Sequence, residues 1–194
     1  LWLQNETPKE WDECVYFSSA MEYFNVKFGA DRFVTDPSMA SRLMVMDIQG
    51  GCFDETIMNK LGMDKSKTSS IVPCGSVIGA ITPEIAEKTG LEPGTKLVMG
   101  AMDQNASTIG MGMTEVGQAG FTLGTAGLLT VVTEHPYCHE SEKLILKPNA
   151  SIGNFTAEGL SMASASAYKW YRDTLCSAEK DAAAKLGVDT YDIM

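Results

Sequence analysis

The apolar and polar residues of the chain follow one another in short blocks, which predict short helices separated by short strands. Several helix starts carry a capping residue followed by proline, as at Thr7-Pro8, Asp36-Pro37 and Thr82-Pro83, because proline fits the first turn of a helix. Glycine after such a segment is typical of a helix end. These signals predict helices in two pieces up to about residue 28, and then over residues 37–44, 54–61, 83–88, 103–112, 159–175 and 179–186.

Between the expected helices lie runs that favour strands. Residues 96–99 are a brief apolar run that we expect to be a buried strand. The β-rich runs 118–123 and 128–133 are joined by a glycine turn, and residues 152–156 are a further strand candidate. Helices mixed with strands indicate an α/β protein. Helix-rich sequence gives way to hairpin-rich sequence near residue 113, which predicts a domain boundary there.

Composition narrows the class of partner. The 194 residues are 44% hydrophobic and 21% charged, as in a globular protein, and carry a formal net charge of −10. A nucleic-acid binder needs a basic face, so we expect no nucleic-acid partner. No apolar run is long enough for a membrane span, and residues 1–6 do not resemble a signal peptide. Five scattered cysteines without CxxC spacing favour free thiols in a cytoplasmic protein.

One carboxylate stands at a predicted turn from strand to helix. Asp103 follows Gly100 at the end of the apolar run, where α/β proteins commonly bind ligands. At the start of a helix it also faces the positive end of the helix dipole. Such a residue can accept a proton from a substrate. The alternative interpretation is that Asp103 only caps the helix.

A loop of small residues, Gly124-Thr125-Ala126-Gly127, joins the two β-rich runs. Glycines let successive N–H groups turn toward one anion, and the Thr125 hydroxyl adds a donor, so the loop could hold phosphate. The alternative is an ordinary hairpin turn. We expect no metal site at His135, Cys138 and His139, because Pro136 disrupts their presentation and no second ligand cluster exists.

The order of these motifs resembles the FGGY carbohydrate kinases, and most closely their xylulokinase-like members. The family pattern V-x-G-x-x-D-Q is similar to Val98–Gln104, its G-x-G helix end to Gly110–Gly112, and its L-G-T-S-G loop to Leu123–Gly127. Its T-D-x-S-x-A-S segment resembles the stretch that begins at Thr35. The helix that follows the phosphate loop in the family is similar to the stretch from Glu158 onward. Nearly the whole chain is covered.

The resemblance implies a partial actin-like, ribonuclease-H-like ATPase fold and the transfer of phosphate from ATP, with Mg²⁺, to a sugar hydroxyl. It implies that Asp103 is the catalytic base and that Gln104 binds the sugar. By the same resemblance, the nucleotide is held by Gly124, Thr125, Ala126, Gly127, Ala165 and Lys169. Ala126 stands where the family usually has serine, which leaves the backbone donors of the loop in place.

The family's early D-x-G-T phosphate loop and its late adenosine loop have no counterpart in the sequence. We therefore expect residues 1–112 to be the end of the N-terminal, sugar-binding domain with the hinge, and residues 113–194 the start of the C-terminal, nucleotide-binding domain. Such a piece would be inactive alone. Unpaired strand edges would favour a homo-oligomer.

Three functions stay open on the sequence. The first is a kinase for a ketopentose such as xylulose. The second is a polyol or glycerol kinase of the same family. The third is a non-catalytic actin-like nucleotide-binding scaffold, against which the presence of Asp103 with Gln104 argues, because a scaffold needs no base.

Overall fold

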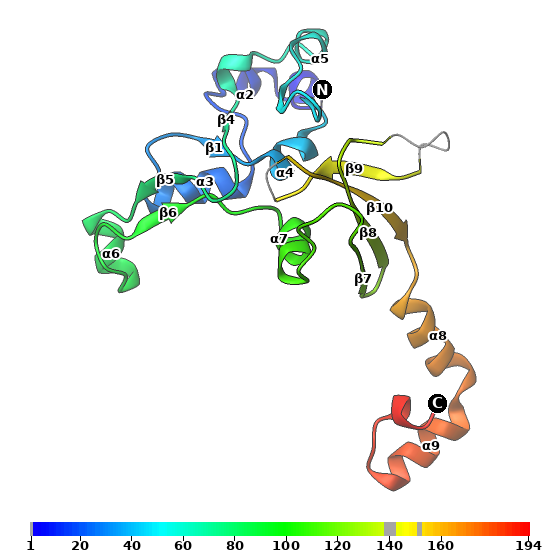
Figure 1. The fold of residues 1–194 in the computed structure, drawn as a ribbon. Coiled ribbons are helices and arrows are strands. Elements are labelled where there is room, and N and C mark those ends of the chain that lie inside the picture. The colour runs from blue at the N-terminus through cyan, green and yellow to red at the C-terminus, as the bar shows by residue number, and fades with distance from the viewer. Residues whose placement is uncertain (1, 138–142, 151–152) are drawn as a thin grey trace.

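The computed structural model describes residues 2–137, 143–150 and 153–194 (Figure 1). Its α-helices are α1 (Trp2–Glu6), α2 (Pro8–Glu13), α3 (Ala20–Phe28), α4 (Pro37–Ala40), α5 (Glu55–Lys60), α6 (Pro83–Thr89), α7 (Asp103–Gly110), α8 (Ala165–Leu175) and α9 (Ser177–Leu186). Short 3-10 helices are η1 (Ser41–Leu43), η2 (Lys65–Lys67) and η3 (Thr190–Asp192). The strands are β1 (Val34–Thr35), β2 (Met46–Asp47), β3 (Cys52–Phe53), β4 (Ser70–Ile71), β5 (Val77–Ala80), β6 (Lys96–Val98), β7 (Ala119–Leu123), β8 (Gly127–Thr133), β9 (Ile145–Pro148) and β10 (Phe155–Ser161).

Most predicted helix starts are confirmed, and side-chain caps explain them. The Asp36 carboxylate accepts hydrogen bonds from two N–H groups of the first turn of α4, and Asp54 and Thr82 each accept one at α5 and α6. Each cap satisfies donors that a helix start leaves unpaired. Thr7 precedes α2 as expected, but its side chain makes no capping hydrogen bond.

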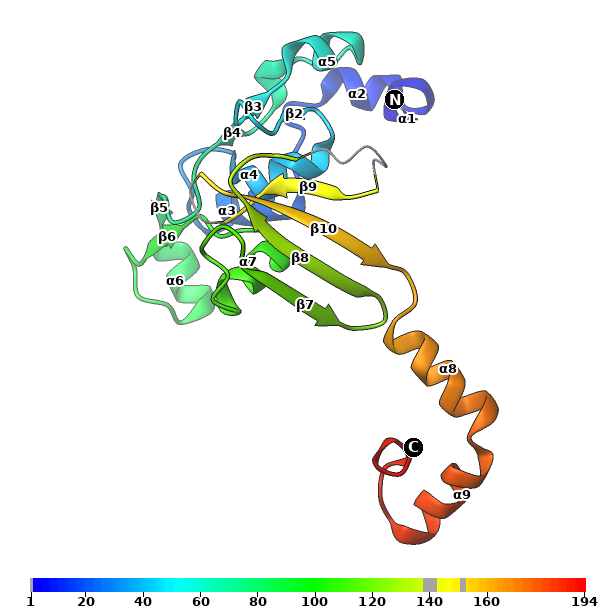
Figure 2. The same ribbon diagram turned by 45° about the vertical axis from the view of Figure 1, so that its right-hand side comes forward.

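The largest sheet has the strand order β7-β8-β10-β9, and every neighbouring pair in it is antiparallel. The predicted hairpin is its β7–β8 pair, in which Leu123 lies opposite Gly127. Helix α7 lies beside this sheet, as Figures 1 and 2 both show. The sheet and α7 together form the frame on which the candidate site is built.

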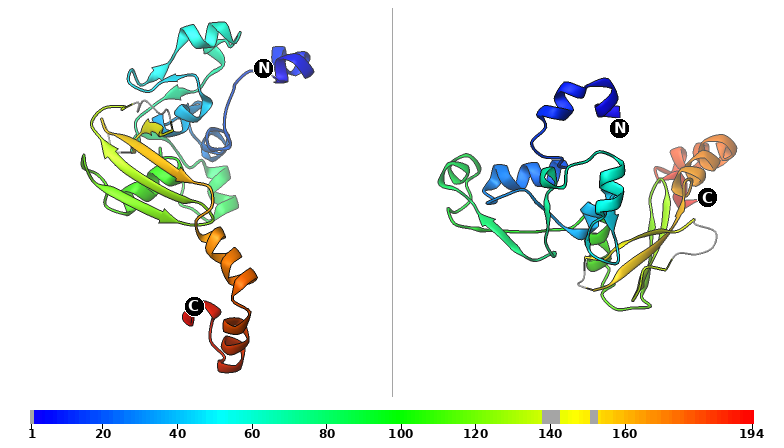
Figure 3. Two further views of the ribbon diagram at one scale, coloured as in Figure 1. Left: turned by 90° about the vertical axis from the view of Figure 1, so that its right-hand side faces the viewer. Right: turned by 90° about the horizontal axis from the view of Figure 1, so that it is seen from above.

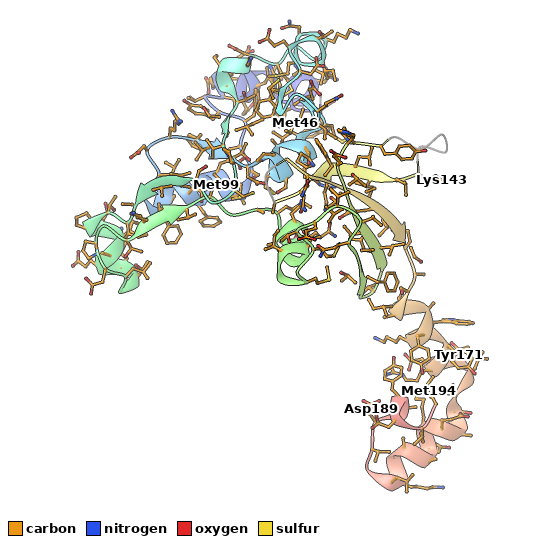
Figure 4. The ribbon with its side chains drawn as sticks, in the orientation of Figure 1. Met46, Met99, Lys143, Tyr171, Asp189 and Met194 are labelled. Carbon is orange, nitrogen blue, oxygen red and sulfur yellow. The ribbon has the colours of Figure 1, made fainter. Side chains whose placement is uncertain are left out.

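The first 112 residues hold two small apolar cores. Met99 packs in one with Ala30, Val34 and Ile78. Met46 packs against the other, which gathers buried residues of the segment from α4 to α5. Figure 4 shows Met46 and Met99 in separate places of this half of the chain. Among the described residues, no helix is long and apolar enough to cross a membrane.

Two predictions about secondary structure are wrong. A helix over residues 159–175 was expected, but β10 runs to Ser161 and α8 begins only at Ala165. Residues 159–161 pair with residues 127–129 of β8, and this distant pairing overrides the local preference for helix. The apolar run at 96–99 does form a strand, β6, but the prediction that this strand is buried is wrong. Among the described strands β6 pairs with β5 alone and leaves Val98 exposed, while Met99 just beyond it is buried. Ile152, the first residue of another predicted strand, lies outside the described residues.

Helix α8 does not bury its aromatic residues. Aromatic side chains of this size are usually core residues, yet the exposed fractions of Trp170 and Tyr171 are 61% and 47%. Figure 3 shows α8 and α9 extending away from the four-stranded sheet. None of the described residues of α8 is buried, so its aromatic residues are not part of a core.

Gly29 provides a sharp test of the packing between α3 and β5. It ends α3 in the left-handed conformation, with φ of 116°, and a Cβ there would overlap the carbonyl oxygen of Ala80. We expect Gly29→Ala to lower the free energy of unfolding by about 3 kcal/mol or more, because strain and overlap add. The matched control is Gly90→Ala, a left-handed helix end in open space, with an expected loss of about 1 kcal/mol. Urea unfolding measures the free energy of unfolding of both variants. Equal losses in Gly29→Ala and Gly90→Ala would contradict the close packing of Gly29 against Ala80.

Candidate active site

Asp103 begins α7 with its carboxylate exposed. Asp103 is not the N-cap residue assumed in the alternative interpretation, because the N-cap is Met102, which makes no side-chain hydrogen bond. Its Oδ1 accepts the N–H of Gln104 at 2.7 Å, inside the first turn. The other carboxylate oxygen is available to a ligand, since the described residues offer it no donor. An exposed carboxylate at a helix start can accept a proton.

A buried network positions the start of α7. The N–H of Met102 donates to Ser38 Oγ at 2.9 Å, and that hydroxyl donates to Asp36 Oδ2 at 2.5 Å. Asp36 and Ser38 are both fully buried. The Asp36 carboxylate therefore holds α4 through its cap and α7 through Ser38, which fixes the residue before Asp103.

Cys74 completes this network, with Sγ 3.5 Å from Asp36 Oδ2. Burial, and then the negative charge of Asp36, raise the pKa of Cys74 to about 12. Because an ordinary cysteine has a pKa near 8.5, the thiolate fraction of Cys74 at pH 8 is lower by roughly a thousandfold. Cys14, Cys52 and Cys176 are also free thiols, and Cys138 lies outside the described residues.

We therefore expect iodoacetamide at pH 8 to alkylate the exposed Cys52 and to leave Cys74 unmodified in the folded protein. Peptide mass spectrometry after timed quenching measures both rates. Asp36→Asn removes the repelling charge, so it should speed alkylation of Cys74 once circular dichroism has confirmed the fold. Equal rates for Cys52 and Cys74 in the parent protein would contradict the raised pKa.

The loop of small residues around 124–127 connects β7 to β8. The alternative interpretation is therefore correct in that the backbone of the loop forms a hairpin turn. Its carbonyls face the start of α8: Ser164 N donates to Thr125 O at 3.0 Å, and Ala165 N donates to Gly124 O at 3.0 Å. Among the described residues, the N–H groups of Thr125 and Ala126 have no acceptor. The loop thus keeps two backbone donors for an anion.

A cavity of about 200 Å³ brings the two motifs together. It lies between α7 and the β7–β8 hairpin, and its lining includes Gln104, Thr108, Gly124, Thr125, Ala126 and Thr130. Asp103 precedes Gln104 on the same helical turn. Residues that were separated by about twenty positions in the sequence therefore border one space.

The remaining predicted site residues are not part of this lining. Gly127 is buried as the first residue of β8, and a Cβ on it would crowd Ser164. Ala165 contacts the loop through its backbone N–H. Lys169 is exposed one turn further along α8, and no contact joins it to the loop among the described residues.

Sequence reasoning missed a buried ion pair behind Gln104. Lys147 on β9 and Glu158 on β10 are 1% and 2% exposed, with Nζ 2.7 Å from Oε1. Thr156 and Glu158 are both buried and alternate along β10 with the less buried Phe155 and Ala157, which is the period of a strand with one inward face. That alternation was the signal available in the sequence. It was missed because the predicted strand ended at residue 156 and the predicted helix began at residue 159, which left Glu158 between the two.

A second cavity of about 200 Å³ lies between the α4–β3 region and the segment that follows β9. Its lining includes Cys74 and Pro148 but no carboxylate, so it offers no base. Within the described ranges, no three His, Cys, Asp or Glu side chains gather as a metal site. Cys138 and His139, considered above as metal ligands, lie outside those ranges.

Comparison with known proteins places the chain in a family. Residues 1–110, more than half of the chain, match the profile of the N-terminal domain of the FGGY family of carbohydrate kinases. The chain belongs to the FGGY family. One relative of this FGGY chain is a gluconokinase from Bacillus licheniformis, which is 27% identical over 100% of this chain. Another is an autoinducer-2 kinase from Klebsiella pneumoniae, which is 26% identical over 100% of this chain. The matches cover 37% and 36% of those two relatives, so the FGGY chain spans little more than a third of their length.

Solved structures confirm the fold class. A ligand-bound xylulose kinase from Lactobacillus acidophilus superposes with a TM-score of 0.82 at 24% identity, over 90% of this FGGY chain and 35% of that protein. A Plasmodium falciparum glycerol kinase with ADP superposes with a TM-score of 0.76 at 20% identity, over 92% of this chain and 38% of that protein. The predicted partial actin-like α/β ATPase fold is therefore correct. The domain boundary at residues 112 and 113 stays a prediction.

Proposed function

We propose that the protein containing these residues phosphorylates a sugar hydroxyl at the expense of ATP. The observation that carries the proposal is the shared cavity, which Gln104 borders from α7 and Thr125 borders from the hairpin loop. Asp103 stands beside Gln104 with an exposed carboxylate. Asp103 itself is not among the lining residues, and we place its carboxylate at the edge of this space because it adjoins Gln104. A proton acceptor close to a group of anion donors is what transfer of phosphate to an alcohol requires.

In this mechanism Asp103 is the catalytic base. It accepts the proton of the attacking sugar hydroxyl, while Gln104 hydrogen-bonds the sugar and orients that hydroxyl. Phosphoryl transfer depends mainly on positioning and on stabilising charge, so a base on a fixed helix start suits it. The buried link from Asp36 through Ser38 to Met102 supplies that fixed position.

The loop would hold the nucleotide phosphates. The free N–H groups of Thr125 and Ala126 and the Thr125 hydroxyl are its donors, with Gly124 and Gly127 allowing close approach. We assign Ala165 and Lys169 to the nucleotide side of the site, because α8 begins at the loop. Mg²⁺ would enter bound to ATP, where it would neutralise phosphate charge.

The proposed acceptor is a ketopentose such as xylulose. Its support is the fold shared with xylulose kinases, whereas the related sequences include a gluconokinase and an autoinducer-2 kinase. We further propose that residues 1–112 form the sugar-binding side and residues 113–194 the nucleotide side. The cavity then lies where α7 of the first part meets the hairpin of the second.

The test is ADP release by the longest natural polypeptide that contains these residues, with ATP, Mg²⁺ and xylulose, ribulose, gluconate or glycerol. We expect ADP release that depends on one of these acceptors, and xylulose to give the highest kcat/KM. Preference for glycerol would indicate the polyol kinase instead. Nucleotide binding without turnover on any acceptor would indicate a scaffold and contradict the proposal.

A further inference from the structure

The buried pair Lys147–Glu158 reaches the predicted sugar-binding residue. Lys147 Nζ donates to Glu158 Oε1 at 2.7 Å and also to Gln104 Oε1 at 3.2 Å. Thr130 Oγ1 lies 3.4 Å from the same Glu158 oxygen. Lys147 and Glu158 are on adjacent strands of the large sheet, so Glu158 fixes the direction in which the ammonium group points.

This contact settles which end of the Gln104 carboxamide faces outward. A lysine ammonium has three donors and no acceptor, so it can bond only the carbonyl oxygen of a carboxamide. With Oε1 held by Lys147, the NH₂ group of Gln104 must point elsewhere, and Gln104 itself is exposed and borders the cavity. The two N–H donors of Gln104 are thereby left for groups other than Lys147, and they suit an acceptor such as a hydroxyl oxygen bound in the cavity.

Further contacts keep Gln104 within reach of Lys147. Asn105 Nδ2 donates to the carbonyl oxygen of Pro148 at 2.7 Å, directly beside Lys147 on the chain. Thr108 Oγ1 lies 3.1 Å from Asn149 Oδ1, one turn further along α7. Asn105 and Thr108 are buried, so α7 is attached along its inner face to the end of β9. These buried side-chain contacts thus set the separation of Gln104 from Lys147.

We propose that Lys147, held by Glu158, is a positioning residue that fixes the Gln104 carboxamide with its NH₂ group toward the sugar hydroxyls. The proposal rests on the proposed function, in which Gln104 binds the sugar. Lys147 acts through Gln104 and touches neither substrate. Its loss should therefore weaken recognition of the sugar and leave recognition of ATP unchanged.

The experiment uses the same natural polypeptide and measures KM for the sugar and for ATP. Lys147→Met should raise the sugar KM roughly tenfold, because a charge-assisted hydrogen bond that orients Gln104 is lost. The double variant Lys147→Met/Glu158→Leu removes the unpaired buried carboxylate as well, and its sugar KM should stay raised. In a Gln104→Ala background, Lys147→Met should add nothing. The matched control is Lys143→Met, which changes an exposed lysine just before β9 (Figure 4).

A purely structural role for Lys147 would give different results. If the double variant recovered the parent sugar KM, or if Lys147→Met had the same effect with and without Gln104, the proposal would be overturned. A rise in the KM for ATP equal to that for the sugar would overturn it too.

A readout without turnover separates this proposal from the proposed function. The side-chain NH₂ signals of Gln104, assigned in ¹⁵N NMR spectra by their loss in Gln104→Ala, should shift in Lys147→Met and stay in place in Lys143→Met. Unshifted signals would overturn the positioning role even in an active kinase. Shifted signals in a protein that phosphorylates no sugar would support the Lys147–Gln104 contact and contradict the proposed function alone.

Discussion

Asp103→Asn is expected to lower kcat for sugar phosphorylation by about 10²- to 10⁴-fold, the usual contribution of a positioned base. Asparagine keeps the shape of the side chain and can still accept the Gln104 N–H, but it cannot take up a proton. Because Asp103 is exposed and asparagine keeps its one side-chain hydrogen bond, from the Gln104 N–H, the free energy of unfolding should change by less than about 0.5 kcal/mol. Sugar-dependent ADP release measures kcat, and urea unfolding measures stability.

The control for this prediction is Glu87→Gln, which neutralises an exposed carboxylate on α6, away from the cavity. It should leave kcat and KM unchanged. If Asp103→Asn retained a kcat within about threefold of the parent, Asp103 would not be the base, since loss of general base catalysis has a far larger effect.

Lys147→Met is expected to lower the free energy of unfolding by about 3–5 kcal/mol. The change leaves the Glu158 carboxylate buried, with only the Thr130 hydroxyl, 3.4 Å away, as a close polar neighbour among the described contacts. An uncompensated charge in the interior is costly, whereas an apolar pair of similar volume is tolerated. Urea unfolding at pH 7 measures the loss.

Lys147→Met/Glu158→Leu is the matched control for charge, and it should recover most of the lost stability. The exposed pair of Lys65 and Glu55 provides a second comparison, because Lys65→Met should cost less than about 1 kcal/mol. A loss of that small size for Lys147→Met would contradict the buried ion pair.

Local signals in the sequence predicted the helix ends well. Three helices begin after the capping residues that the sequence indicated, which are Asp36, Asp54 and Thr82. Two helices, α3 and α6, end at a glycine, Gly29 and Gly90 respectively. These features depend on a few neighbouring residues, so the sequence holds the information. The hairpin around residues 124–127 was predicted for the same reason, because its glycines are adjacent.

Distant pairing was out of reach of local patterns. Residues 159–161 belong to β10 because β8 offers them partners about thirty positions earlier, although a run of alanine and serine favours helix. Lys147 and Glu158 were overlooked because charged residues are rarely buried unless they pair, and their pairing exists only once β9 and β10 are adjacent.

The candidate site was predicted in its parts, and the structure adds how they meet. Gln104 and Thr125 border one cavity, which nothing in their spacing required. The roles of Asp103, Gln104 and the loop stay predictions, based on the family resemblance and on the exposed carboxylate and free N–H groups described above.

The most direct test of the central proposal is ³¹P NMR of the natural polypeptide incubated with ATP, Mg²⁺ and the sugar panel. We predict that a phosphomonoester of the sugar appears as the γ-phosphate signal of ATP disappears, and that Asp103→Asn nearly abolishes this conversion. Inorganic phosphate as the product in place of a sugar phosphate, or an equal rate of sugar phosphate formation in Asp103→Asn, would contradict it.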